Sequence, residues 1–239
     1  MKRRTVALFA LAGLLLFSGC LGGGGVSEER LNRNVTYDWQ TDANVTVNVT
    51  ATEYHAVYEI RNRTVLNFTR ETELSGNQPV SVAGVKFRYP NGTVVGADHL
   101  QVTEEGSKTV VRLPADQGKF AYTASSGSRS VHVPVAVSGS HEVILPPGVR
   151  ASVPLFGSVE PSADSRTVNE TTDRVHYRWK TVDANTISID YYLQRDLYIF
   201  AGLVGLLVLV GIGGVVYYRL KIRRLERERT EMGLDLEEE

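Results

Sequence analysis

One uncharged apolar run near the C-terminus constrains this chain more than any other feature. The run extends from Leu197 to Tyr218 and contains 22 residues without a charged side chain. At about 1.5 Å per residue, a helix of this length spans roughly 33 Å, which is enough to cross a hydrocarbon core of about 30 Å. The sequence therefore predicts a single transmembrane helix over residues 197–218.

The charges beside this run predict its orientation. Residues 219–229 carry six bases and two acids, whereas residues 21–196 carry 17 bases and 20 acids. Positive charge collects on the cytoplasmic side of membrane helices, so we expect residues 219–239 to form a charged cytoplasmic tail whose bases contact lipid headgroups. The basic residues directly after the helix are Arg219, Lys221, Arg223 and Arg224. Because the basic excess is confined to this flank, no nucleic-acid partner is expected.

The N-terminus has the three parts of a secretory signal peptide, predicted over residues 1–19. Basic residues 2–4 precede an apolar run from Thr5 to Phe17, and two small residues follow. Cys20 comes next, as in a lipobox, so we expect Cys20 to be lipidated and residues 20–30 to form a glycine-rich tether. The alternative is an uncleaved signal anchor. Cys20 is the only cysteine, so no disulfide forms within the chain.

The body between the two ends alternates apolar and polar residues with a period of two. Val45, Val47 and Val49 show this pattern, and the same alternation recurs around Val131–Val137 and Val175–Trp179. Such segments are half-buried strands, and glycine- and proline-rich turns separate them. We therefore predict an all-β ectodomain of one or two antiparallel, immunoglobulin-like β-sandwich units. Residues 31–137 form a sandwich, and residues 138–196 form either a second β unit or a continuation of the first.

The junction between the body and the membrane is predicted to be short. Residues 193–196 form a linker of about four residues, so the body cannot swing far. Tyr191 and Tyr192 precede this linker, and we expect both at headgroup level, where tyrosine is common.

Asparagine usage predicts N-glycosylation. Seven of the ten asparagines are followed, two residues later, by threonine, without an intervening proline. These acceptor positions are Asn34, Asn44, Asn48, Asn62, Asn67, Asn91 and Asn169. The pattern of strands and turns places each side chain on a solvent-facing side. The alternative interpretation is that Asn and Thr are simply common in turns and on exposed strand faces.

No catalytic, metal or cofactor site is predicted. The five histidines are scattered, and no pair has the close spacing of metal ligands. Neither a nucleophile elbow nor a phosphate-binding glycine loop occurs, and the single cysteine belongs to the leader. We expect His55, His132 and His176 on the polar faces of their strands, without a chemical role.

Several motifs together resemble a known family. They are the lipobox and its tether, Tyr37-Asp38-Trp39, Phe87–Thr93, Leu145–Gly148 and Tyr191–Leu197. This set resembles a haloarchaeal family of lipobox-bearing, single-pass membrane proteins with a domain of unknown function. The resemblance implies an envelope location and archaeal N-glycosylation, and it implies no activity. The ectodomain is only mildly acidic, which departs from the strongly acidic haloarchaeal composition.

The sequence thus predicts a non-enzymatic, glycosylated binding or assembly module of the cell envelope, with its N-terminal domain outside the cell membrane. The expected partners are membrane lipid and an envelope protein complex or the surface layer. The alternative is an extracytoplasmic receptor for a small molecule or metal, or a weak hydrolase, with a cleft in the sandwich. Small residues Ala201 and Gly205 in the span fit a homodimer through the transmembrane helix.

Overall fold

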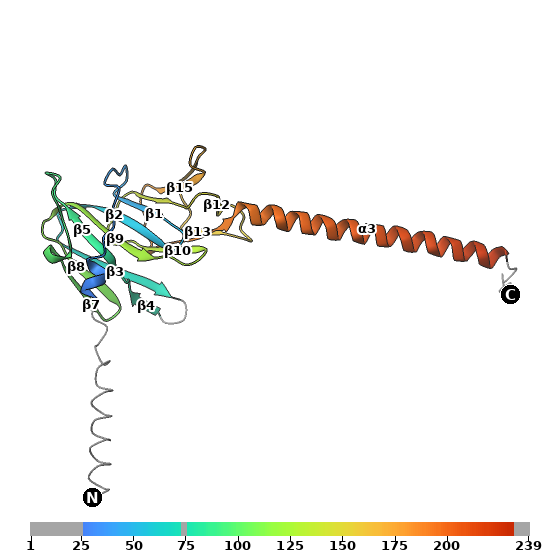
Figure 1. Cartoon of the computed structure of the whole chain (residues 1–239), viewed down its shortest axis with the longest axis horizontal. Coiled ribbons are helices and arrows are strands. Elements are labelled where there is room, and N and C mark those ends of the chain that lie inside the picture. The colour runs from blue at the N-terminus through green and yellow to red at the C-terminus, as the bar shows by residue number, and fades with distance from the viewer. Residues whose placement is uncertain (1–25, 73–75, 232–239) are drawn as a thin grey trace, which may run out of the picture. The chain divides into compact units, whose positions relative to one another are not determined.

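The computed structural model describes residues 26–72 and 76–231 and separates them into two parts. The first is a β-rich body that ends at Tyr192, and the second is a helical part that begins at Leu193 (Figure 1). The predicted all-β body followed by one apolar helix is therefore confirmed. The predicted signal peptide and Cys20 lie outside the described residues.

The largest layer of the body is an eight-stranded sheet (Figure 1). All of its described pairings are antiparallel except one, since β1 (Val45–Val49) runs parallel to β11 (His141–Ile144). These two strands lie on opposite sides of the boundary predicted at residue 138, yet they are hydrogen-bonded neighbours in this sheet. In spatial order the strands are β14 (Ser165–Asn169), β15 (Arg174–Trp179), β11 (His141–Ile144), β1 (Val45–Val49), β2 (Glu53–Arg61), β9 (Gln117–Ser125), β5 (Ala83–Arg88) and β6 (Val94–Val95).

Smaller sheets complete the body. A four-stranded sheet has the order β4 (Gly76–Pro79), β3 (Val65–Thr72), β8 (Lys108–Arg112) and β7 (Gln101–Glu105). A three-stranded sheet has the order β10 (Ser130–Pro134), β16 (Thr186–Asp190) and β13 (Ser158–Glu160). β12 (Val149–Arg150) and β17 (Tyr192–Leu193) form a two-stranded sheet. Two short helical turns, α2 (Glu28–Leu31) and η2 (Ala97–His99), complete the described elements of the body.

An aromatic cluster joins the eight-stranded and four-stranded sheets. Phe68 on β3 lies 4.9 Å from the ring of Tyr122 on β9 and 5.5 Å from the ring of Tyr58 on β2. All three side chains are fully buried. The Tyr58 hydroxyl donates a 3.0 Å hydrogen bond to the carbonyl oxygen of Pro134 on β10, which ties the three-stranded sheet to the same core. A buried tyrosine hydroxyl needs such a partner.

The observed strands follow the alternation in the sequence. Val45, Val47 and Val49 are buried on β1, while Thr46 and Asn48 between them are half-buried on the outer face. Side chains alternate across a strand, so each strand gives its apolar residues to the core and its polar residues to the other face of the sheet. This outer, polar face carries the candidate site described below.

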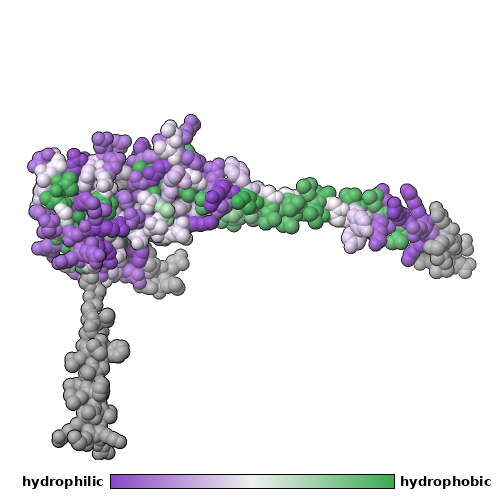
Figure 2. Space-filling model, viewed as in Figure 1, coloured by the Kyte–Doolittle hydropathy of each residue, from purple (hydrophilic) through white to green (hydrophobic). Residues whose placement is uncertain are grey.

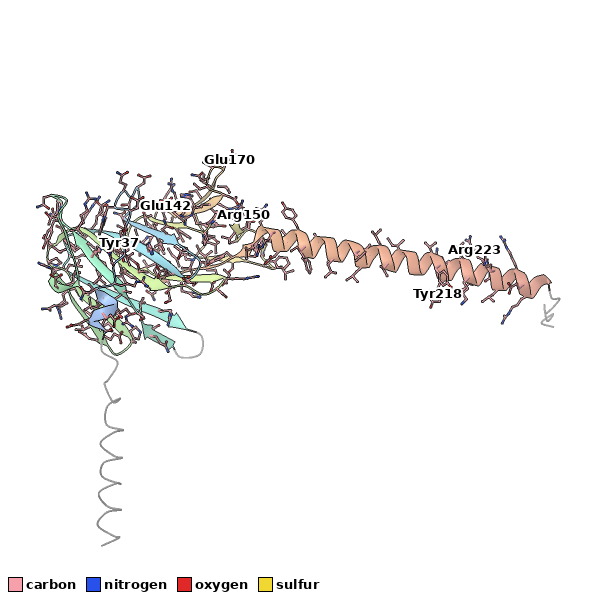
Figure 3. All side chains as sticks on the ribbon, viewed as in Figure 1. Tyr37, Glu142, Arg150, Glu170, Tyr218 and Arg223 are labelled. Carbon is pink, nitrogen blue, oxygen red and sulfur yellow. The ribbon has the colours of Figure 1, made fainter. Side chains whose placement is uncertain are left out.

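The helical part consists of α3 (Gln194–Glu231), a single helix of 38 residues. It is long and apolar enough to span a membrane, and Figure 2 shows a hydrophobic stretch along its middle with hydrophilic residues toward its C-terminus. The predicted basic residues Arg219, Lys221, Arg223 and Arg224 are exposed on its C-terminal half. Tyr218 and Arg223 mark this transition in Figure 3.

The structure corrects the prediction for the junction. The helix begins at Gln194, directly after β17, so residues 194–196 are helical and no free linker separates strand from helix. Tyr191 and Tyr192 are buried in the body, so their rings pack against protein and are not exposed as the prediction required. Burial raises the pKa of Tyr191, whose hydroxyl has no hydrogen-bond partner among the described residues.

Candidate functional site

An extended segment crosses the outer face of the eight-stranded sheet, and we name residues 35–42 the strap. Two lysines of the sheet hold its backbone: Lys86 Nζ donates to the carbonyl oxygen of Val35 at 2.6 Å, and Lys119 Nζ donates to that of Trp39 at 2.7 Å. Val35 and Tyr37 pack with two apolar residues of the sheet in a small core of their own. The strap is therefore fastened by charge-assisted hydrogen bonds and by packing.

Tyr37 fixes the middle of the strap. Its hydroxyl donates to the carbonyl oxygen of Gly84 at 2.8 Å and lies 2.9 Å from the hydroxyl of Thr123. Burial raises the pKa of Tyr37 to about 12, so this hydroxyl stays protonated and remains a donor. Gly84 has a φ of +57°, and a Cβ there would lie 2.7 Å from Val35 Cγ2. Only glycine lets the strap approach the sheet this closely.

A groove of about 380 Å³ lies between the strap and strands β1, β2, β11 and β15, and we name it the charged groove. Figure 3 marks Tyr37 and Glu142, which both line it. The hydroxyl oxygen of Thr46, also in the lining, is buried and has no hydrogen-bond partner among the described residues. The other polar residues of the lining include Asp38, Gln40, Asp42, Asn48, His55, His176 and Arg178.

A buried carboxylate forms the centre of the charged groove. Glu142 on β11 is only 4% exposed, and its Oε1 accepts hydrogen bonds from His176 Nδ1 at 2.8 Å and Arg178 Nε at 2.9 Å. Both donors come from the neighbouring strand β15, where Arg178 is directly opposite Glu142. A buried charge is tolerated only when it is paired, and these two contacts supply the pairing. Nδ1 is the ring nitrogen of His176 that faces this carboxylate.

A second histidine of the groove has a similar arrangement. His55 on β2 lies 3.1 Å from Glu53 Oε1, and Arg33, just before the strap, donates to Glu53 Oε2 at 2.7 Å. Partial burial opposes ionisation of Glu53, but the hydrogen bonds from Arg33 and His55 outweigh it and lower the pKa of Glu53. The outer face thus carries two sets of one carboxylate, one histidine and one arginine.

The histidines have hydrogen-bond partners that the sequence did not indicate. His176 and His55 are paired as described, and His132 lies 3.0 Å from the hydroxyl of Ser188. His141 is buried, donates from Nδ1 to the carbonyl oxygen of Gly139 at 2.9 Å, and has no described partner at Nε2. Burial lowers the pKa of His141, which favours its neutral form. Among residues 26–72 and 76–231, no group of three or more His, Cys, Asp or Glu is placed to hold a metal.

The strap also contributes to a second, larger groove of about 590 Å³, the basic groove. Its lining combines the aromatic side chains of Trp39 and Tyr89 with the cationic side chains of Arg61, Arg88 and Lys119. Arg61 is paired with Glu59 at 2.8 Å. Aromatic and arginine side chains are the residue types that dominate protein binding sites, so this surface suits a partner with negative charge.

The seven predicted glycosylation sites fall into two groups. Five side chains are exposed, as expected: Asn34, Asn62, Asn67, Asn91 and Asn169. Asn44 and Asn48 are half-buried and hydrogen-bonded, so the expectation that all seven point to solvent is wrong for these two. Asn48 Oδ1 accepts a 2.5 Å hydrogen bond from Arg174, and Asn44 Oδ1 accepts from the backbone N–H of Ser140 at 3.0 Å.

We expect Asn44→Ala to lower the free energy of unfolding by about 1–3 kcal/mol, because it leaves the N–H of Ser140 without its acceptor. Gly139, beside Ser140, lets the backbone approach this side chain closely, since a Cβ there would lie 2.5 Å from Asn44 Oδ1. The matched control is Asn67→Ala, which removes an exposed acceptor asparagine and should change stability by less than about 0.5 kcal/mol. Urea denaturation followed by tryptophan fluorescence measures both. Equal effects would show that Asn44 has no structural role.

Comparison with models of known families gives a match over most of the chain. The model of a family of unknown function (DUF5803) matches residues 41–237, which include the end of the strap, all described strands and the helix. No curated protein matches the chain.

Proposed function

The chain belongs to DUF5803, a family of unknown function, and we propose that it is a non-catalytic binding or assembly module held at the cell membrane by α3. The observation that carries this proposal is the division of the chain into a folded β body and one apolar helix. The basic residues after the span support an orientation in which the body is extracytoplasmic and the tail is cytoplasmic.

The finer parts of the proposal rest on sequence motifs. The leader followed by Cys20 supports lipidation, which would give the body a second attachment to the membrane. The exposed acceptors Asn34, Asn67, Asn91 and Asn169 support N-glycosylation of the body, with Asn44 and Asn48 left unmodified. Asn62 is also exposed, but it lines the basic groove, and the proposal leaves it unmodified as well. The resemblance to haloarchaeal envelope proteins supports an archaeal cell surface as the location.

The basic groove supports a binding role for the body. Its cations and aromatic rings fit an acidic surface of an envelope protein complex or of the surface layer. A body fixed close to the membrane is better placed to assemble with neighbouring envelope components than to capture distant solutes. We therefore propose the basic groove as the contact surface.

The charged groove supports a second candidate function, an extracytoplasmic receptor for a small polar molecule. Glu142, His176 and Arg178 converge there. The hydroxyl of Thr46, which has no hydrogen-bond partner in the described part of the chain, lies in the same lining. Binding sites of this kind place a few polar groups for orientation in a largely preformed pocket.

Affinity purification from native membranes in mild detergent tests the first proposal. We expect the C-terminally tagged chain to recover a companion in stoichiometric amount, and Arg88→Glu to abolish that recovery by reversing a charge in the basic groove. The control is Arg112→Glu, the same change on an exposed residue of β8, which should leave the companion bound. A wild-type chain that returns alone would favour the receptor. A companion that survives Arg88→Glu would exclude this groove as its binding site.

A further inference from the structure

A loop of the body exposes apolar side chains that a soluble surface would normally bury. Residues 151–157 connect β12 to β13, and within them Leu155 is 81% exposed and Phe156 is 36% exposed. Elsewhere in the described body, the exposed large apolar side chains are Val65 at 38% and Val94 at 44%, each on a strand. Pro154 is also exposed, so the loop tip presents three consecutive apolar residues.

The base of this loop is fastened to the last residues of the body before the helix. After the loop, Ser158 on β13 is opposite Asp190 on β16. Before the loop, β12 is the hydrogen-bonded neighbour of β17, which begins at Tyr192. The ring of Phe156 packs edge-on against Tyr192 at 5.9 Å, and the Ser152 hydroxyl lies 3.4 Å from the Tyr192 hydroxyl.

The shape of the loop tip is fixed by its own backbone. The N–H groups of Phe156 and Gly157 both donate to the carbonyl oxygen of Val153 at 2.9 Å. Gly157 packs so closely that a Cβ there would lie 2.6 Å from the carbonyl oxygen of Asp190. The exposed apolar residues are therefore held on a tight turn next to Tyr192, the last residue of the body.

We propose that the tip of this loop, residues 154–156, inserts into the interfacial layer of the membrane and seats the body on the lipid surface. The inference rests on the proposed function, because it takes α3 as the membrane span. From Tyr192 to Leu197 the chain makes two extended and three helical steps, which cover at most roughly 12 Å. The headgroup layer is roughly 5–7 Å thick on each side of the hydrocarbon core. Tyr192 and its neighbour Phe156 are thereby kept close to that layer.

Lipid fits this surface better than a protein partner does. Three side chains on one turn are far smaller than a stable protein interface, which buries about 1,200–2,000 Å² in total. Amphipathic surfaces that lie on membranes bury a few leucine and aromatic side chains at the boundary between headgroups and acyl chains. The tyrosines expected in this layer, Tyr191 and Tyr192, are buried in the body, and the loop supplies apolar side chains in their place.

An environment-sensitive fluorophore on a single cysteine tests the proposal. In the full chain, Cys20→Ser removes the native thiol and Leu155→Cys supplies a single site for a nitrobenzoxadiazole label. The labelled protein is reconstituted into phosphatidylcholine vesicles that contain, as a quencher, a lipid with a nitroxide near its headgroup. Tyr198→Cys, an exposed position early in α3, serves as the positive control. Val94→Cys, an exposed apolar position of β6, serves as the negative control. We expect a blue-shifted emission and loss of fluorescence at residue 155, as at residue 198, with neither at residue 94.

The two ways in which this test can fail are distinguishable. A label quenched at residue 198 but not at residue 155 would leave α3 as the span and overturn the inserted loop. A label quenched at neither residue would show that α3 does not enter the bilayer, which would overturn both the loop proposal and the membrane anchoring on which it rests.

Discussion

Replacing Phe68 with alanine is expected to lower the free energy of unfolding of the body by about 3–5 kcal/mol, the range for removing a buried aromatic ring from a core. Phe68 is fully buried on β3, yet its ring contacts lie on the other sheet: Tyr58, Phe120 and Tyr122, at 5.5, 6.0 and 4.9 Å. The substitution therefore opens a cavity between the two layers. The described strands of the two layers pair only within their own sheets, so packing holds the layers together at this point.

Urea denaturation of wild type and Phe68→Ala, followed by tryptophan fluorescence, measures this effect. Val65→Ala is the matched control, because Val65 lies on the same strand but is 38% exposed, and it should cost less than about 1 kcal/mol. A similar small loss for both variants would contradict the placement of β3 over β2 and β9.

Two arginines in the middle of the apolar run are expected to remove the helix from the membrane. Arginine at the centre of a membrane helix costs about 2.5–3.5 kcal/mol on insertion scales, so Leu207→Arg with Val208→Arg costs about 5–7 kcal/mol. At about 1.4 kcal/mol per factor of ten, this shifts the distribution toward water by roughly four orders of magnitude. Both residues are exposed on α3, so the body keeps its own core.

Flotation of residues 26–239 with lipid vesicles measures this change without any contribution from the leader or from Cys20. Wild type should float, and the variant with two arginines should stay at the bottom of the gradient. The control places the same two arginines at Leu220 and Ile222, beyond the predicted span, where basic residues are already frequent. Loss of flotation in both variants would show that the residues after position 218 also lie in the bilayer.

Local patterns in the sequence predicted the elements of this fold well. The alternation of Val45, Val47 and Val49 predicted β1 with its buried face, and the uncharged run predicted the apolar helix. Both features depend on residues close together in the chain. The parallel pairing of Val45 with His141 was not predictable, because it joins segments almost a hundred residues apart and no spacing in the sequence reports it.

The charged groove could not be predicted for the same reason. Glu142 and His176 are 34 residues apart, and the antiparallel register of β11 and β15 brings them within hydrogen-bond distance. Alternation had correctly placed His176 on a polar face, but it could not reveal the buried carboxylate beside it. Tyr37 was noted only as part of a motif, because the role of the strap depends on tertiary contacts with Gly84 and Thr123.

The junction shows what a local rule leaves out. Tyrosines next to a membrane span usually lie among the headgroups, which made Tyr191 and Tyr192 natural candidates. In the structure both pack into the body, since the last strands continue almost to the start of α3. Tertiary packing thus determines what these two rings contact, and their spacing from the span does not report it.

Labelling of single cysteines in intact cells tests most directly the central claim, that the body is extracytoplasmic and the tail cytoplasmic. Cys20→Ser removes the only native cysteine, after which Ser107→Cys places a thiol on an exposed turn of the body and Arg229→Cys places one near the end of α3. With a membrane-impermeant maleimide, residue 107 should be labelled in intact cells and residue 229 only after permeabilisation. Labelling of residue 229 in intact cells, or protection of residue 107, would contradict the proposed orientation.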